Sequence, residues 1–251
     1  MKDKYIIKPF NKIYCVFFIC FGLFSYIFGT YMKILDVDNK YSILITLSIF
    51  NIVIFIVYRY LMQFDKEYID IWYKDYGKVN YYNELPLYPC NVVLLLYPIA
   101  FIFRNRFILS FCFFMCIVGP CFALLNPTKG FEKYSIFKPR ILFYYLTHTI
   151  ELITAPLLVL SNLYIPTFLD TFNAVIMLFI MMSIAHVVNI YLIKSEKNNI
   201  ANYFYTMHDE GVGLLKFFYK KFPHKYFYML ESVPVIWGIF LAITIITILL
   251  V

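Results

Sequence analysis

Long apolar runs separated by short polar stretches dominate the hydropathy pattern of the chain. A transmembrane helix needs roughly 20 predominantly apolar residues. Seven runs come close to this length, and they cover residues 13–30, 41–62, 85–103, 107–125, 141–163, 168–193 and 233–251. We therefore predict an all-α, polytopic membrane protein with seven transmembrane helices, in which residues 1–251 form a single integral membrane domain.

The composition supports this class of protein. Only 15% of the residues are charged and 62% are hydrophobic, whereas soluble domains carry about 25% charged residues. The net charge of +7 comes from basic residues in short loops between apolar runs. Such a distribution reflects membrane topology rather than a nucleic-acid-binding face. We expect membrane phospholipids, and no nucleic acid, as partners.

The basic residues also predict the orientation of the chain. With seven spans, one side of the membrane receives the N-terminus and the three long loops. The other side receives only four of the 22 Lys and Arg residues, namely Lys33, Lys40, Arg104 and Arg106. By the positive-inside rule, the N-terminus is cytoplasmic and the C-terminus lies outside. The predicted location is the cell membrane, with multiple passes.

Of the six cysteines, Cys90 has the surroundings that suggest chemistry. It stands between Pro89 and Asn91 at the start of an apolar run, and proline is favoured in the first turn of a helix. The free amides and the positive dipole end of that helix can stabilise a thiolate and receive an oxyanion. The other five cysteines are expected to be small core residues. No zinc spacing is present, and we expect neither a metal nor an organic cofactor.

Few ionisable residues lie inside the predicted spans, and such residues are usually functional or paired within the bundle. They are His148 and Glu151 in the fifth run and His186 in the sixth, with Asp170 near an outer end. At 1.5 Å per helical residue, Cys90 lies about 7–8 Å and each histidine about 12 Å from the cytoplasmic edge. For His186, a hydrogen bond to a neighbouring helix is the favoured interpretation. Asn202 and Tyr203 fall in a polar segment and are expected to form a solvated turn.

Several short motifs resemble those of one family. Leu85-Pro86-Leu87, followed after two residues by Cys90-Asn91, resembles the hallmark of the YwaF-like bacterial integral membrane proteins and of their animal relatives, the transmembrane protein 164 family. The similarity extends over most of the chain, from roughly the second span to the last. It includes four further motifs, Gly119-Pro120, Asn126-Pro127, Tyr145-Leu146-Thr147-His148 and Asn202-Tyr203.

The resemblance implies a seven-helix fold with an intramembrane Cys–His pair, and an enzyme that moves a fatty acyl chain between phospholipids. Cys90 would be the acyl-accepting nucleophile and His148 its base, with Asn91, Glu151 and His186 as supporting residues. A lipid ester hydrolase would use the same pair. Two alternatives remain. One is a small-solute transporter, or its substrate-binding membrane subunit, with a His/Glu polar site. The other is a structural membrane protein whose polar residues only join helices.

Overall fold

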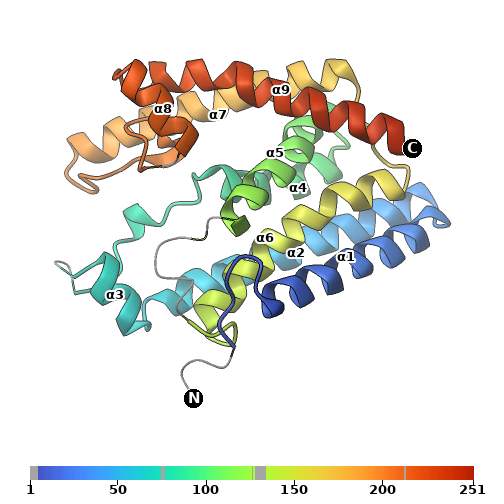
Figure 1. Cartoon of the computed structure of the whole chain (residues 1–251), viewed down its shortest axis with the longest axis horizontal. Helices are drawn as coiled ribbons and strands as arrows, with labels where there is room; N and C mark the ends of the chain where they lie inside the picture. The colour runs from blue at the N-terminus through green and yellow to red at the C-terminus, as the bar shows by residue number, and fades with distance from the viewer. Residues whose placement is uncertain (1–4, 75–76, 126, 128–133, 212) are drawn as a thin grey trace.

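The computed structural model describes residues 5–74, 77–125, 127, 134–211 and 213–251 (Figure 1). Apart from one antiparallel bridge between Ile6 and Ser135, regular structure in these ranges is entirely helical. The elements are α1 (Lys12–Lys33), α2 (Val37–Met62), α3 (Lys66–Trp72), η1 (Tyr81–Asn83), α4 (Pro89–Ile102), α5 (Arg106–Leu125), α6 (Pro139–Leu160), α7 (Phe168–Lys194), η3 (Tyr203–Tyr205), α8 (Gly213–Lys221) and α9 (Phe227–Leu250).

The helices confirm the prediction of an all-α, multi-pass membrane protein. Six of them, α1, α2, α5, α6, α7 and α9, are long and apolar enough to cross a bilayer, whereas α4 is apolar but has only 14 residues. It begins at Pro89 rather than at residue 85, because Pro86 and Pro89 cannot donate the hydrogen bonds of a continuing helix. The last helix starts at Phe227 rather than at residue 233.

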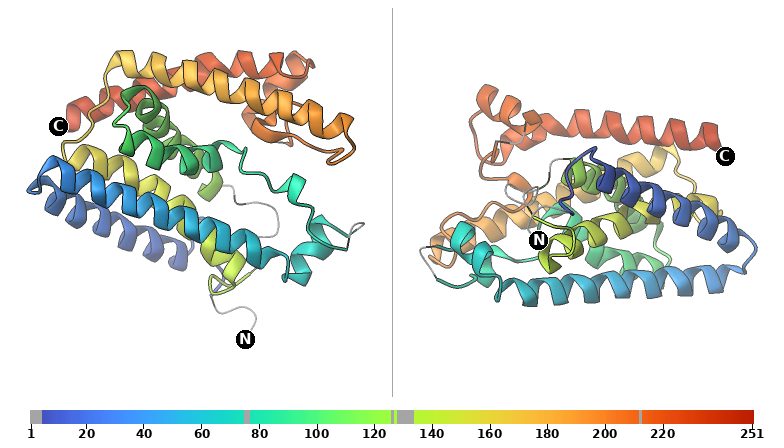
Figure 2. Two further views of the ribbon diagram at one scale, coloured as in Figure 1. Left: turned by 180° about the vertical axis from the view of Figure 1, so that it is seen from behind. Right: turned by 60° about the horizontal axis from the view of Figure 1, so that its bottom comes forward.

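The long helices are arranged in three layers (Figures 1 and 2). The first layer holds α1, α2 and α6, the middle layer α4 and α5, and the last layer α7 and α9. Helix α5 connects the layers, because it packs against α4, α6 and α7. Few side chains of α1 and α9 are buried, and their exposed apolar surface fits contact with lipid tails.

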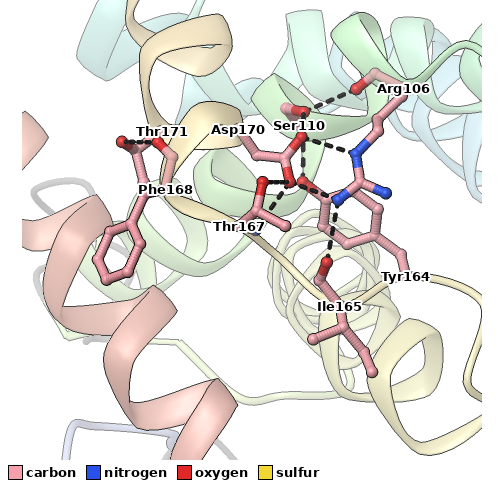
Figure 3. A network of polar contacts seen from close by, with 8 residues as sticks. All are labelled: Arg106, Ser110, Tyr164, Ile165, Thr167, Phe168, Asp170 and Thr171. Carbon is pink, nitrogen blue, oxygen red and sulfur yellow. Dashed lines mark hydrogen bonds and ion pairs between the residues drawn. The ribbon is translucent and has the colours of Figure 1, made fainter.

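A polar network joins the beginning of α5 to the beginning of α7 (Figure 3). The buried carboxylate of Asp170 accepts hydrogen bonds from Arg106 Nε (2.9 Å) and Nη2 (2.6 Å), and from Ser110 Oγ (3.0 Å). It also accepts bonds from the backbone N–H (2.8 Å) and the hydroxyl (2.7 Å) of Thr167, which form the N-terminal capping box of α7. Asp170, expected near an outer end, is therefore fully engaged in holding two helices together.

Replacing Asp170 by alanine is expected to lower the free energy of unfolding by about 2–4 kcal/mol, because several buried donors lose their acceptor at once. Chemical denaturation in mixed micelles would measure this loss. The control is Asp38→Ala, since Asp38 pairs with Arg104 at an exposed position and exposed ion pairs contribute little. Equal effects of the two changes would contradict the structural role of the network.

The ends of the α4 segment are fixed to the two ends of α2. Before α4, Glu84 forms an ion pair with Arg59 near the C-terminal end of α2, and accepts hydrogen bonds from Tyr68 and Tyr73. After α4, Arg104 pairs with Asp38 at the start of α2. The chain from Glu84 to Arg104 therefore runs alongside most of the length of α2, although its helical part is short.

Candidate functional site

The fold places Cys90 as the second residue of α4, in the first helical turn. The side chain of the preceding N-cap residue, Tyr88, makes no capping hydrogen bond. Within the described ranges, no backbone carbonyl of another residue outside the helix accepts from the N–H of Cys90 or Asn91, and the Cys90 N–H faces its own thiol. These two amides are the kind of donors that hold an oxyanion at a helix N-terminus. Cys90 is half-buried as a residue, and its Sγ faces Gly119 of α5.

The chain that leads to Cys90, residues 85–88, is not helical, which corrects the depth derived from helical rise. Four non-helical residues cover up to about 13 Å, against about 6 Å in a helix. Pro86 and Pro89 have no N–H, so this segment carries fewer donors that the membrane would leave unsatisfied. The N–H of Leu85 donates to the hydroxyl of Tyr203 (3.1 Å). The helical rise therefore does not apply to residues 85–88, and the depth of Cys90 derived from it is not retained.

Gly119 of α5 makes room for the Cys90 thiol. A Cβ atom added to Gly119 would come 2.8 Å from Cys90 Sγ, closer than real Cβ contacts. The close approach of α4 and α5 at this point thus depends on the absence of a side chain at residue 119. This observation gives Gly119 of the Gly119-Pro120 motif a physical role beside the thiol.

His148 projects from the middle of α6, where Tyr144 sets its orientation. Its Nδ1 lies 2.8 Å from the Tyr144 carbonyl oxygen, one turn earlier, and its ring packs on the Tyr144 ring with 4.4 Å between centroids. A carbonyl oxygen can only accept, so Nδ1 carries the proton and a neutral imidazole keeps its lone pair on Nε2. The Tyr144 hydroxyl donates to the Ala123 carbonyl of α5 (2.7 Å). The ring of His148 is therefore held with Nε2 available as a base.

Cys90 and His148 lie on neighbouring helices and share a neighbour. Helices α4 and α6 contact each other, and both pack against α2 and α5. The Cys90 thiol is within electrostatic range of Tyr144, the residue on which His148 stacks. In the described part of the chain, no hydrogen bond joins Cys90 directly to His148. The structure thus brings the two predicted residues to one region without a preformed thiol–imidazole bond.

The predicted supporting residues have different positions. Glu151 is 3% exposed, its Oε2 has no hydrogen-bond partner among the described residues, and it is within electrostatic range of Cys90 and Cys116. It does not orient His148, because Tyr144 does. Asn91 is the residue after Cys90 in the first turn of α4 and is partly buried, with its backbone amide beside the thiol.

His186 belongs to a separate polar cluster. Its Nδ1 lies 3.0 Å from Thr206 Oγ1, and its ring packs against Tyr226. Asn189, one turn further along α7, donates to the Tyr203 carbonyl (2.9 Å) and to Thr206 Oγ1 (3.0 Å). Among the described residues, no contact joins His186 to Cys90 or His148. The histidine connects α7 to the following loop, in keeping with the favoured packing interpretation.

The expectation of a solvated turn at Asn202 and Tyr203 is wrong, because both residues are almost completely buried. The Asn202 side chain bonds the backbone of Met207 and His208 and the carboxylate of Glu210. The Tyr203 hydroxyl donates to the Tyr82 carbonyl (2.6 Å) and accepts from Leu85 N–H. Burial raises the pKa of Tyr203 to about 12, so this donor stays protonated. We call residues 85–88 the lead-in to Cys90. Tyr203 holds the start of this lead-in through Leu85, and we call Asn202 and Tyr203 the clamp.

Sequence reasoning missed the residues that support Cys90 and His148. Tyr144 and Glu84 are the clearest cases, together with Arg59, which stacks over Phe55 and pairs with Glu84. Arg59 and Glu84 gave no signal because they are far apart in sequence, whereas Tyr144 lies one helical turn before His148 and its spacing was an available signal. The motif Asn202-Tyr203 was the available signal for the clamp.

Together these features define a multi-pass helical membrane protein with a thiol, an imidazole and a carboxyl group gathered inside its bundle. In the part of the chain that the structure describes, no three His, Cys, Asp or Glu residues form a group suited to a metal ion. The chain belongs to the TMEM164 family, whose sequence model matches residues 8–250. This match confirms the resemblance carried by the short motifs, of which Asn126 lies outside the described residues. Comparison with curated proteins and with solved structures gives no match.

Proposed function

We propose that the protein is a membrane-embedded lipid acyltransferase, or lipid ester hydrolase, that uses Cys90 as nucleophile and His148 as base. One observation carries the proposal. Cys90 is half-buried at an uncapped helix N-terminus, and the contacting helix α6 carries His148, whose Nδ1 is bound by the Tyr144 carbonyl. A thiol, a base and oxyanion donors are the components of covalent acyl transfer. The family resemblance points to the same chemistry.

In the proposed reaction, His148 Nε2 takes the proton of the Cys90 thiol. The thiolate attacks the ester carbonyl carbon of a phospholipid, and the backbone N–H groups of Cys90 and Asn91 stabilise the oxyanion. The carbon–oxygen bond then breaks, and the leaving alkoxide takes the proton from His148. A lysophospholipid hydroxyl or a water molecule next attacks the thioester, gives its proton to His148, and releases the thiol. The cycle needs no metal or organic cofactor.

Accessibility of the lead-in supports entry of a lipid from the end of the bundle that carries Arg59 and Glu84. Every residue from 83 to 91 is partly exposed. At the same end, a cavity of about 370 Å³ lies between the end of α2 and the start of α6, with Leu61, Phe64 and Lys138 in its wall. Its wall also holds Asp65 and Glu67, which pair with Lys138, so its apolar side chains, rather than a free cation, suit the acyl chains of a membrane lipid.

We also propose that the chain crosses the cell membrane seven times, as one integral membrane unit. The attachment of the Glu84–Arg104 segment to both ends of α2 supports a crossing by α4 and its non-helical lead-in. Asp38 and Arg59 are separated by about 32 Å of helix, close to the thickness of the hydrocarbon core. The distribution of Lys and Arg then favours a cytoplasmic N-terminus and an external C-terminus.

The test is intact-protein mass spectrometry after incubation of the purified protein with phospholipid. We expect a fatty-acyl adduct that hydroxylamine removes, since thioesters are cleaved by this reagent. A wild-type protein that carries no adduct, beside an equally clean His148→Ala variant in which a slowly resolved thioester would accumulate, would contradict the proposal.

Loss of His148 and loss of Cys90 are expected to be non-additive. Each single alanine variant should lower lipid turnover by at least about 1000-fold, and the double variant should be no slower than Cys90→Ala, because either change disables the same unit. Turnover of a fluorescent phospholipid would measure all three. Additive losses would show that the two residues act separately.

A small-solute transporter is the second candidate, and two buried atoms favour it. Asn51 Oδ1 and Glu151 Oε2 have no hydrogen-bond partner in the described ranges, and unsatisfied polar groups within membrane helices often mark a solute or proton path. A transporter should depend on Glu151 and tolerate Cys90→Ser. The acyltransferase should lose activity with Cys90→Ser. Assays of both variants separate the two functions.

A further inference from the structure

Residues 203–206 present an aromatic side chain to the Cys90 region from the far side of the bundle. Phe204 and Tyr205 both have positive φ values, 54° and 56°. Two consecutive non-glycine residues in the left-handed region are strained, and such strain persists only where surrounding contacts enforce it. It is common at ligand-binding and catalytic positions.

The contacts that enforce this conformation come from three elements. Asn189 of α7 binds the N–H and the carbonyl of Tyr203. Asn202 fixes the chain after the turn through Met207 N–H. Tyr228 of α9 donates to the Tyr205 carbonyl. Hydrogen bonds thus hold the backbone before and after Tyr205, and this backbone conformation sets where the Tyr205 side chain begins.

The Tyr205 side chain lies against the start of α4. The Tyr205 ring contacts the ring of Tyr88, the N-cap residue of α4, with 5.9 Å between centroids. Its phenol is within electrostatic range of Cys90 and of Tyr144, the support of His148. Tyr205 is half-buried, and within the described ranges no hydrogen bond involves its hydroxyl. Burial raises the pKa of Tyr205 above its ordinary value, which keeps the hydroxyl protonated and able to donate.

We infer that Tyr205 is a further catalytic residue, whose hydroxyl donates a hydrogen bond to the acyl carbonyl oxygen when Cys90 attacks. This inference rests on the proposed function. As the sulfur–carbon bond forms, the π electron pair of the carbonyl moves to oxygen, and the Tyr205 O–H stabilises that charge together with the first-turn amides of α4. The proton remains on Tyr205 throughout. When the oxyanion collapses, the carbon–oxygen bond to the leaving alcohol breaks and His148 supplies the proton.

Tyr205→Phe removes only the hydroxyl, and Tyr88→Phe is the matched control. Tyr88 belongs to the same aromatic cluster, but the strongest electrostatic influence on its hydroxyl comes from Glu210 rather than Cys90. The experiment follows thioester formation on the full-length protein with a phospholipid, by rapid-quench mass spectrometry. We expect at least a tenfold slower acylation in Tyr205→Phe with an unchanged KM, since one oxyanion donor is lost while two amides remain. Tyr88→Phe should acylate within twofold of wild type.

The outcomes separate the inference from the proposed function. Acylation of Tyr205→Phe at the wild-type rate, or equal losses in both variants, would overturn the role of Tyr205 while a wild-type thioester on Cys90 still stands. Absence of that thioester in the wild type would instead contradict the proposed function. Thermal unfolding of each variant in micelles checks the fold. Tyr205→Trp, which fills the site without a hydroxyl at the same place, should also acylate slowly if the oxygen matters.

Discussion

Alanine at position 90 is expected to abolish the acyl-thioester and lipid turnover while leaving the fold intact. Cys90→Ala removes the thiol and keeps the backbone N–H, and loss of a covalent nucleophile costs several orders of magnitude in rate. Removal of one half-buried sulfur atom from the first turn of α4 should cost only about 1 kcal/mol of stability. Intact-mass analysis and thermal unfolding of the same sample would measure both effects.

Two other cysteines provide the controls. Cys20 lies on the exposed side of α1, and Cys116 is buried in α5, where its thiol donates to the Phe113 carbonyl (3.1 Å). Both alanine variants should keep the hydroxylamine-sensitive adduct. If Cys90→Ala also keeps the adduct, the nucleophile lies elsewhere. If Cys90→Ala unfolds, the residue has a packing role and the catalytic interpretation fails.

Alanine at position 119 is expected to slow acylation by at least about 100-fold, because a misplacement of the reacting atom by about 1 Å costs that much. The new Cβ would lie 2.8 Å from Cys90 Sγ, so the thiol or the start of α4 must move. Alanine also favours helix over glycine by about 1 kcal/mol. We therefore expect a protein that is nearly as stable as wild type but poorly active. Single-turnover acylation and the unfolding midpoint would show this separation.

Gly238→Ala is the matched control for Gly119→Ala. Gly238 is also helical, in α9, and an added Cβ there meets nothing within 4 Å. This variant should keep full acylation and gain slightly in stability. Unchanged activity in Gly119→Ala would mean that the thiol has freedom to move, and that close packing of α4 on α5 does not set its position.

Hydropathy was sufficient to predict most of the fold, because a bilayer imposes long apolar helices whatever their contacts. The start of α4 was placed too early, since Leu85 and Leu87 are apolar and the two prolines that stop the helix lie among them. Burial of Asn202 and Tyr203 was missed for a related reason. Composition predicts that a segment is polar. It does not show that the polar atoms of the segment bind each other and the backbone of Tyr82 and Leu85, which are distant in sequence.

The site itself was partly predictable. Cys90 and His148 followed from local sequence and from resemblance; the structure places them on contacting helices, and their roles stay predictions. The roles of Gly119 and Tyr205 did not follow, because they come from contacts between elements distant in sequence, and the contact of Tyr144 with His148 one turn later was overlooked. The position of His186 depended on Thr206, which no periodic pattern links to α7.

The bond between Leu85 and Tyr203 has a consequence for the order in which the protein is made. These residues are 118 positions apart, so the clamp partner is synthesised long after the nucleophile has entered the membrane. A nascent chain that stops before residue 200 would carry Cys90 without the clamp that positions its lead-in. Under the proposed function, only a chain that extends past the clamp would attack lipid esters, so membrane lipids would be spared while the protein is still being synthesised.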